Sequence, residues 1–322
     1  MTLQLGPIYT KGKTYRARAE ARQREYRART LCVDHGKYGH FLTQESADAG
    51  LNFILHEAFE AARARQQAGK GVAPRTFENM LSSQAMCFNV FAPLSNRPEL
   101  ATQVLLPFIT GLQSVSAIHI EHTPTADIFG DQTGRGGVDC DLLIEGRTHG
   151  GRLVQVVETK FVEPEFSVCG FRKPGRAKKG QEICPDYVAV GSDRAACLYT
   201  RKKGYAYWRR SDEFNVLVEN AVPAAGCPFA GDRWQLWVNL ALAHAEAERR
   251  AATDVRFAVC SSSANDALLG GGEVLDGFRT LLRQPDAVTL IDLDELLTRI
   301  EAVAPPDLAV WAAALRARYA GI

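Results

Sequence analysis

The stretch VDCDLLIEGRTHGGRLVQVVETKF, residues 138–161, decides the fold, because it contains two short apolar runs joined by a glycine-containing turn. Runs of Val, Leu and Ile bounded by turn residues are typical of buried strands, so this stretch predicts a β-hairpin. Asp139 and Asp141 precede the first run, and Glu158 ends the second, with Lys160 two positions later. Burying charged groups is costly unless they are paired, so the presence of four charged side chains beside buried strands needs a physical explanation.

Strand geometry predicts that the charged side chains share one face of the sheet. Side chains two positions apart on a strand point to the same face, so the two aspartates form one pair and Glu158 and Lys160 another. A hairpin with Glu145 opposite Arg152 would place Asp139 opposite Glu158. A one-residue slip of this register would separate the two pairs. We therefore expect three carboxylates and one ammonium group to cluster.

Such a cluster is typical of a metal site that hydrolyses phosphodiester bonds. A divalent cation neutralises clustered carboxylates, and hard oxygen ligands suit Mg²⁺ or Mn²⁺. The ion can polarise a phosphoryl oxygen and lower the pKa of a bound water, while Lys160 stabilises charge in the transition state. Asp141 and Glu158 are the expected metal ligands, and Asp139 is the alternative aspartate. The competing interpretation is that the aspartates begin a strand and that Glu158 and Lys160 form a solvated strand end.

The whole-chain composition narrows the class of protein but identifies no partner. The chain has 322 residues and 35.3 kDa, is 46% hydrophobic and carries a formal net charge of +1. It has no apolar run of the roughly 18 residues that a membrane helix needs, and no secretory signal, so we expect a cytoplasmic protein without a membrane partner. Eight cysteines without a CxxC pair favour reduced thiols over disulfides.

The order of expected elements predicts an α/β fold in which helices flank a mixed sheet. The expected strands are 114–122, the two of the hairpin, 255–260 and 287–293. The expected helices are 46–66, 75–92, 98–110, 231–250, 273–284, 294–302 and 308–320. Three successive strands followed by α and β units favour a mixed sheet. We expect a basic helical extension over 1–74 and one domain over 75–322, with an insertion at about 162–230.

Two basic segments, 11–29 and 172–210, suit a polyanion such as DNA. The first has few apolar residues to bury, so residues 1–30 are expected to form a solvated basic helix. The second interleaves basic residues with Tyr199, Tyr205, Tyr207 and Trp208, which could stack on bases or form a small core of the insertion's own. The alternative is that both segments are ordinary solvated surface.

Three segments together resemble a known family. LSSQAMCFNVFAPL precedes the DCDLLIE…ETKF core, and a CPF…QL segment follows it. This arrangement resembles the PD-(D/E)xK nuclease superfamily, which has the restriction-endonuclease-like fold, and more narrowly a group of bacterial restriction-endonuclease-like proteins. The resemblance covers about residues 75–260. The chain departs from the family pattern at Cys140, which stands where the family has a proline.

The resemblance implies roles for individual residues. Asp141 and Glu158 correspond to the metal-binding acids, and Lys160 corresponds to the catalytic lysine. Glu78 resembles the acid that some members add from the preceding helix, and Gln235 resembles a glutamine near the metal or the DNA backbone. Some nucleases of this superfamily hold zinc or an iron-sulfur cluster, for which the insertion offers four cysteines: Cys169, Cys184, Cys197 and Cys227. Their spacing is looser than zinc ribbons use, so separate buried thiols are the default expectation.

The functional prediction is a Mg²⁺-dependent phosphodiesterase, a deoxyribonuclease acting as an endonuclease in restriction or phage defence. A water held by the metal would attack phosphorus, and a homodimer would allow both strands to be cut. The alternatives are a single-strand or end-processing nuclease, and a catalytically silent nucleic-acid-binding module with the same fold. A silent module would be expected to have lost a member of the acid-acid-lysine set, which is intact here.

Overall fold

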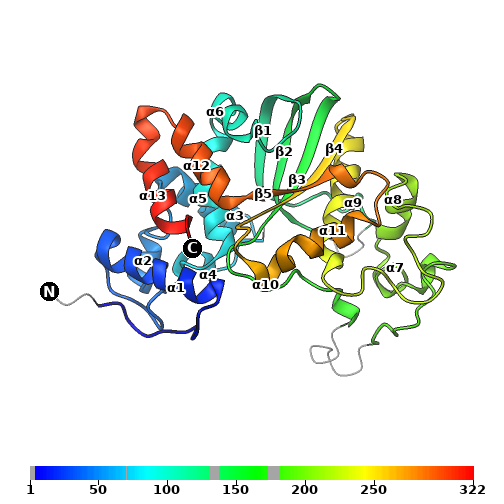
Figure 1. Ribbon diagram of the computed structural model, residues 1–322, viewed down its shortest axis with the longest axis horizontal. Helices are drawn as coiled ribbons and strands as arrows, with labels where there is room; N and C mark the ends of the chain where they lie inside the picture. Colours follow the sequence, from blue (N-terminus) through cyan, green and yellow to red (C-terminus); the bar gives the residue numbers. More distant parts are fainter. Residues whose placement is uncertain (1–3, 70, 131–137, 173–181) are drawn as a thin grey trace.

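A five-stranded mixed sheet forms the centre of the protein (Figure 1). The computed structural model describes residues 4–69, 71–130, 138–172 and 182–322. The strands are β1 (Leu112–His122), β2 (Cys140–Thr148), β3 (Gly151–Thr159), β4 (Asp254–Ser261) and β5 (Val288–Asp292), and they lie in chain order across the sheet. The first three pair antiparallel and the last two join in parallel. The predicted α/β fold with a mixed sheet is confirmed.

The register of the hairpin differs from the prediction by two residues. Glu145 pairs with Val154 instead of Arg152, because both strands continue into the expected turn. The predicted register was therefore wrong, although a two-residue shift leaves every side chain on its predicted face. The pairing continues to Leu142 and Val157, so the next residues along, Asp141 and Glu158, lie across from each other. Asp141, and not Asp139, is thus the aspartate opposite Glu158.

Two hydrophobic cores lie on opposite faces of the sheet. One face packs against α5 (Ser83–Ser95), α6 (Pro98–Leu105), α12 (Leu293–Val303) and α13 (Ala309–Tyr319). The other face packs against α9 (Arg233–Arg249), α8 (Tyr207–Glu213) and α11 (Glu273–Arg279). In Figure 1 the first group lies to the left of the strands and the second to the right. The site described below lies where α5 and α9 approach the ends of β2 and β3.

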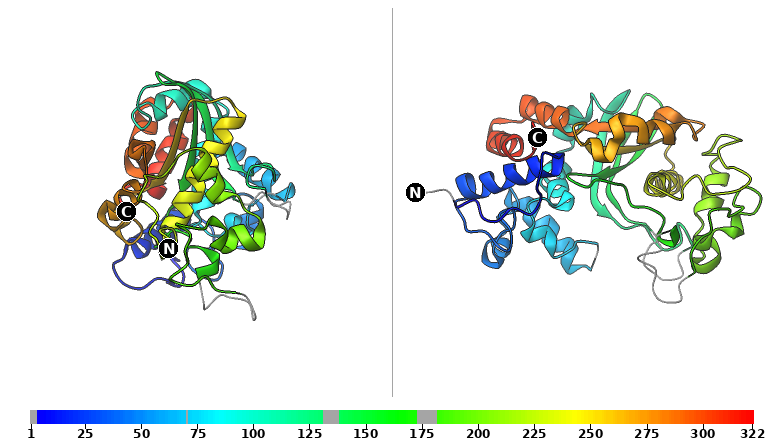
Figure 2. Two further views of the ribbon diagram at one scale, coloured as in Figure 1. Left: turned by 90° about the vertical axis from the view of Figure 1, so that its right-hand side faces the viewer. Right: turned by 60° about the horizontal axis from the view of Figure 1, so that its bottom comes forward.

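The N-terminal helix α1 (Tyr15–Tyr26) is packed rather than solvated, which corrects the prediction for residues 1–30. It lies beside α13 (Figure 2), and Tyr15 and Ala19 belong to the first core. Its Arg22 donates a 3.2 Å hydrogen bond to the carbonyl oxygen of Ala317. Arg27, which begins the π-helix η1 (Arg27–Leu31), is 1% exposed and donates to backbone carbonyl groups. Part of the basic charge therefore satisfies backbone oxygens instead of facing solvent.

Each of two expected helices is divided in two. Residues 46–66 form α2 (Gln44–Asp48) and α3 (His56–Gln67), because the intervening Gly50 adopts a left-handed φ of 78°. Residues 75–92 form α4 (Arg75–Glu78) and the first part of α5, whose N-terminus is capped by the Ser82 hydroxyl. The remaining helices are α7 (Leu198–Lys203) and α10 (Asp266–Leu269).

Helix α5 continues through Pro93 to Ser95, whereas the sequence predicted that it would end before the proline. A proline inside a helix has no N–H to donate, which leaves the carbonyl four residues earlier without a partner. Here the indole N–H of Trp311 in α13 donates a 2.8 Å hydrogen bond to the Asn89 carbonyl oxygen. A distant helix therefore replaces the missing hydrogen bond and allows α5 to continue.

The insertion packs on the second core, and all four of its predicted aromatic residues pack there. Tyr207 and Trp208 are each 1% exposed and belong to that core, whereas Tyr199 and Tyr205 are only partly buried. Among its described residues most basic side chains are paired with acids; Arg201 and Lys202, for example, both contact Glu182. Residues 173–181 of the basic segment and residues 131–137, which precede the hairpin, lie outside the described residues.

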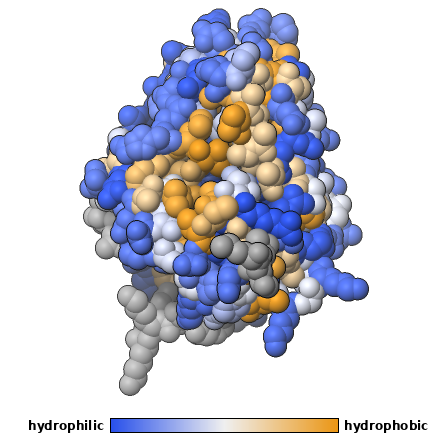
Figure 3. Space-filling view, turned by 90° about the vertical axis from the view of Figure 1, so that its left-hand side faces the viewer, coloured by the Kyte–Doolittle hydropathy of each residue, from blue (hydrophilic) through white to orange (hydrophobic). Residues whose placement is uncertain are grey.

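Figure 3 views the molecule from the side of α12 and α13, the left-hand side of Figure 1. Hydrophobic residues gather near the middle of this face, and hydrophilic residues surround them. Contiguous apolar patches with a polar rim are typical of contact surfaces. In the described part of the chain, no helix has the length and apolar character needed to cross a membrane.

Candidate active site

Asp141, Glu158 and Lys160 meet in a cleft of about 440 Å³. Asp141 lies near the start of β2, Glu158 lies near the end of β3, and Lys160 directly follows β3. The beginning of α5 forms the opposite wall, so the cleft is bounded by the two strand ends and a helix N-terminus. The antiparallel pairing explains this placement, since it brings the start of one strand to the end of the other.

Glu158 is buried and held by three hydrogen-bond donors. Glu158 is only 4% exposed, and Lys160 Nζ lies 2.7 Å from its Oε1. Gln235 Nε2 donates to Oε1 over 2.7 Å, and Asn239 Nδ2 donates to Oε2 over 2.8 Å. The two amides stand four positions apart on α9 and therefore share one helix face. This clamp satisfies the buried carboxylate and fixes its orientation.

Lys160 is an ammonium group inside this cluster. Burial lowers the pKa of Lys160, but the carboxylates of Glu158 and Asp141 outweigh burial and raise it above its usual value. Lys160 is 8% exposed, so little water is available to solvate its ammonium group. The site thus presents a fixed positive charge directly beside two acids.

Asp141 retains some exposure toward the cleft, but most of its surroundings are protein. Its Oδ2 accepts hydrogen bonds of 2.7 Å from both the backbone N–H and the hydroxyl of Thr159. Burial raises the pKa of Asp141 well above its usual value, and the charges of Glu158 and Glu121 raise it further. The carboxylates therefore repel one another in a poorly solvated site, which a cation would relieve.

Glu121 is an acid beside this cleft that the sequence did not reveal. It does not line the cleft itself, but Gln84, which does, forms a hydrogen bond with its side chain. Glu121 lies near the end of β1, where Ile120 pairs with Leu142 and His122 pairs with Cys140. Glu121 is therefore opposite Asp141 on the neighbouring strand. Its φ of 53° is left-handed, which breaks the alternation of side chains at this point. Arg65 donates to the Glu121 carbonyl oxygen and so supports this backbone conformation. The segment HIEH predicted only a strand, because periodicity cannot show a reversed backbone angle.

The Glu121 side chain is buried and electrostatically strained. It is 5% exposed, and its Oε1 has no hydrogen-bond partner among the described residues. Burial raises the pKa of Glu121 to about 7, and the charges of Glu158 and Asp139 add to this, while a hydrogen bond with Gln84 opposes it. An unpartnered buried carboxylate oxygen beside two other acids suits a cation ligand.

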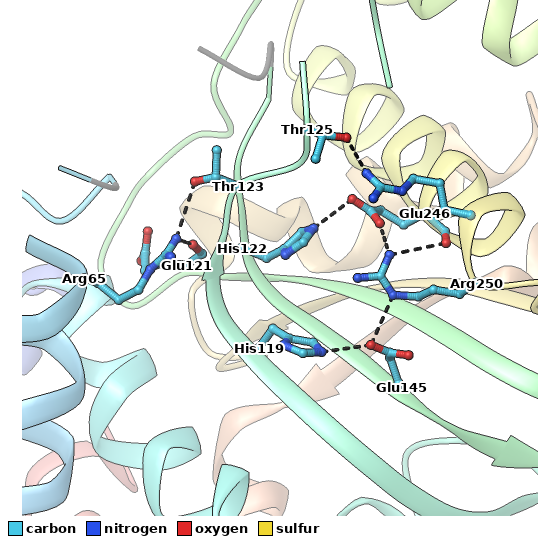
Figure 4. Close-up of polar contacts among 10 residues, drawn as sticks. Arg65, His119, Glu121, His122, Thr123, Thr125, Glu145, Glu246 and Arg250 are labelled. Atoms are coloured by element: carbon cyan, nitrogen blue, oxygen red, sulfur yellow. Dashed lines mark hydrogen bonds and ion pairs between the residues drawn. The ribbon is translucent and has the colours of Figure 1, made fainter. Parts of the chain in front are cut away.

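A network of charged side chains joins β1 and β2 to α9 (Figure 4). His119 and Arg250 both contact the Glu145 carboxylate, at 2.8 and 3.1 Å. His122 lies 2.8 Å from Glu246, which also pairs with Arg250. Because α9 carries the amides that hold Glu158, this network fixes the helix relative to the strands that supply the acids.

The other predicted residues occupy different places. Gln235 lies in the site, and its Oε1 also accepts a 2.8 Å hydrogen bond from the Ser167 N–H. Asp139 is exposed and lies on the Glu121 side, outside the residues that line the cleft. Glu78 ends α4 and does not line the cleft either. Asn239 was missed, although its position four residues after Gln235 was the signal that could have found it.

One comparison with known proteins identifies a family for this chain. A sequence model described as the PD-(D/E)XK nuclease superfamily matches residues 11–203. The chain belongs to the PD-(D/E)XK nuclease superfamily. The resemblance drawn from the sequence is therefore confirmed, and the match extends further toward the N-terminus than expected. No curated protein and no solved structure matches the chain. Gln235 and Asn239 lie beyond the matched range, so their place in the site comes from the fold.

PD-(D/E)XK nucleases typically use divalent metals, and the donor set of this site fits one. Asp141 and Glu158 offer hard carboxylate oxygens, and the unpartnered oxygen of Glu121 lies beside them. Within residues 4–69, 71–130, 138–172 and 182–322, no three His, Cys, Asp or Glu side chains already form a metal-binding group. Glu158 is instead engaged by Lys160, so binding would require this ion pair to adjust.

Proposed function

We propose that this PD-(D/E)XK protein is a divalent-metal-dependent DNA nuclease that acts as an endonuclease in restriction or defence. The observation that carries the proposal is the meeting of Asp141, Glu158 and Lys160 in one cleft. The intact set of Asp141, Glu158 and Lys160 favours a catalyst over a silent binding module. Buried carboxylates that repel one another destabilise the fold, and a module without activity would gain nothing that offsets this cost. Superfamily membership supports nuclease chemistry in general.

The chain's own residues would position and stabilise the reacting phosphodiester. A divalent metal held by Asp141 and Glu158, with Glu121 close by, would supply a Lewis acid for the phosphoryl oxygen. Lys160 would stabilise the negative charge that develops at phosphorus, and its low exposure strengthens this effect. Gln235 and Asn239 hold Glu158 in one orientation, which avoids reorganisation during the reaction.

DNA would reach the cleft along the N-terminal side. Arg16, from the basic segment 11–29, and Arg75 both line the cleft beside the acids. Arginines at this position suit phosphate oxygens, which fix the register of a nucleic acid. In the segment 172–210, Arg194 pairs with Asp212, so this described part offers less free charge. We therefore assign the main backbone contact to the N-terminal segment and a secondary one to the insertion.

The test is cleavage of supercoiled plasmid and of linear single-stranded DNA with Mg²⁺, Mn²⁺ or EDTA. We expect metal-dependent nicking or linearisation of the plasmid, abolished by Glu158→Ala and by Lys160→Ala. Lys37→Ala and Glu219→Ala, at exposed positions outside the cleft lining, are matched controls that should leave cleavage unchanged. Cleavage that survives both site substitutions would remove this cleft from the mechanism.

The same experiment separates the alternatives. Digestion confined to single strands or ends would indicate an end-processing nuclease. DNA binding without cleavage under any metal would indicate a silent module, and Mn²⁺ that stays bound in Glu158→Ala would argue against the proposed ligand set. A homodimer that cuts both strands is a further proposal, supported by the apolar patch in Figure 3 and tested by sedimentation with and without DNA.

A further inference from the structure

Four cysteines from separate parts of the insertion line one small cavity. Cys169 follows β3, Cys184 comes after the first part of the insertion, Cys197 precedes α7, and Cys227 precedes α9. The cavity measures about 20 Å³. Apolar residues complete most of its lining: Phe171, Val190, Leu198, Tyr199 and Ala230. The chain's other four cysteines lie elsewhere, so the fold has gathered only those of the insertion.

The four thiols are close enough to influence one another. Burial raises the pKa of Cys227 to about 12, and the other three cysteines of the cavity add to that rise. Burial likewise raises the pKa of Cys169 to about 11, with contributions from Cys197 and Cys184. Charge on one thiol would repel charge on the next, which is the physical source of these contributions. The four are free thiols, as the sequence spacing predicted, and the fold places all of them around one cavity.

Two of the sulfurs also receive backbone hydrogen bonds that favour the thiolate form. The N–H of Phe171 donates to the Cys169 sulfur, and the N–H of Phe229 donates to the Cys227 sulfur. In both cases the donor lies two residues after the cysteine. Hydrogen bonds of this kind stabilise negative charge on sulfur and commonly support metal-bound thiolates. Arg172 lines the same cavity and adds a positive charge nearby.

We propose that Cys169, Cys184, Cys197 and Cys227 bind one zinc ion as four thiolates. A cavity needs roughly 10–15 Å³ to hold a single water, so about 20 Å³ suits one ion and is too small for a multinuclear cluster. Four sulfur ligands in tetrahedral geometry are typical of structural zinc. Binding converts four thiols into thiolates and releases four protons, which leaves a site of net charge −2 beside Arg172.

Binding would require the side chains to turn further inward. The described residues contain no preformed group of three or more metal-ligand side chains, and all four cysteines are free thiols. The four residues already border the same space, so the movement that the proposal requires is rotation about the cysteine side-chain bonds. Zinc binding would then bring the four sulfurs to bonding distance from the ion.

The zinc site would fix both ends of the insertion beside the cleft. Cys169 lies two residues after Ser167, whose N–H bonds Gln235, and Cys227 lies shortly before the helix that carries Gln235. Closing a loop between these ends limits the freedom of the unfolded chain and stabilises the native arrangement. This role is structural and independent of the proposed nuclease activity.

The experiment measures metal content in the purified full-length chain. We expect one zinc per chain in the wild type, a loss of that zinc in Cys227→Ser, and full retention in Cys32→Ser, whose cysteine is exposed and does not line the cavity. Replacing zinc with Co²⁺ should produce intense sulfur-to-cobalt charge-transfer absorption and the visible bands of a tetrahedral site.

Two results would overturn the proposal. Iron together with inorganic sulfide would show a cluster instead of a single ion, and a wild-type chain that takes up neither zinc nor cobalt would show separate thiols. If Cys227→Ser does not fold, the wild-type cobalt spectrum and zinc release by a mercurial reagent decide between these outcomes. None of these measurements depends on DNA cleavage.

Discussion

Replacing Glu121 with glutamine should stabilise the metal-free protein at pH 8 while impairing its function. Burial and neighbouring acids raise the pKa of Glu121 from 4.5 to about 7. Each unit corresponds to about 1.4 kcal/mol, so the ionised side chain costs the native state about 3 kcal/mol. Glutamine removes this charge with almost the same shape. The free energy of unfolding should therefore rise by up to this amount.

The sign of the effect depends on pH in a defined window. The native state holds the Glu121 proton more tightly than the unfolded state, so stability falls as pH rises from about 4.5 to about 7. The difference between Glu121→Gln and wild type should be near zero at pH 4.5 and largest at pH 8. Urea unfolding in EDTA at both pH values measures it.

Glu145 provides the matched control, because its environment acts in the opposite direction. Burial raises its pKa, but hydrogen bonds from His119 and Arg250 outweigh this and lower it. This carboxylate contributes stability above its unfolded pKa, so Glu145→Gln should destabilise the protein at pH 8. A Glu121→Gln variant that is no more stable than wild type at pH 8, or that gains equally at both pH values, would refute the reasoning. Adding Mg²⁺ should stabilise wild type more than Glu121→Gln.

Three further predictions concern the clamp, the cleft wall and the strained backbone. Asn239→Leu removes one hydrogen-bond donor to Glu158. A hydrogen bond to a charged group contributes about 1.5–3 kcal/mol, so kcat should fall roughly tenfold or more while KM stays unchanged. An unchanged kcat would contradict the role of the two amides in holding Glu158. Arg16→Ala should weaken DNA binding and reduce its salt dependence by about one phosphate contact in a fluorescence titration, and an unaltered salt slope would exclude that contact. Gly71→Ala should lower stability in urea by about 1–2 kcal/mol, because Gly71 has a φ of 73° and a new Cβ would lie 3.2 Å from Glu121 Oε2; full stability would show that the segment moves freely.

The elements that depend on local pattern were predictable. The hairpin strands, the helix that carries Gln235 and the faces of Asp141 and Glu158 follow from side-chain period and turn chemistry, which nearby residues determine. The acid-acid-lysine set was predictable for the same reason, because a strand places residues two positions apart on one face. The exact register was not predictable, since a two-residue shift preserves every face and leaves the hydrophobic pattern equally satisfied.

Long-range contacts account for the errors. Helix α5 passes Pro93 only because Trp311, distant in the chain, donates to the exposed carbonyl. The basic N-terminal helix is packed because Tyr15 and Ala19 join the first core and Gln23 donates a buried hydrogen bond to the Arg318 carbonyl oxygen in the last helix of the chain. In both cases the contacting residue lies far away in the chain, so the local sequence pattern cannot reveal it. The sequence therefore predicted that α5 would end before Pro93 and that the N-terminal helix would be solvated.

The sequence by itself determined the sheet, its active strands and three members of the candidate site, because alternation and spacing act over a few residues. The tertiary structure alone decided that Glu121 joins them, because a left-handed backbone angle and the pairing of β1 with β2 set its position. It also decided that the four insertion cysteines border one cavity, because chain folding, and not sequence distance, sets which residues surround it.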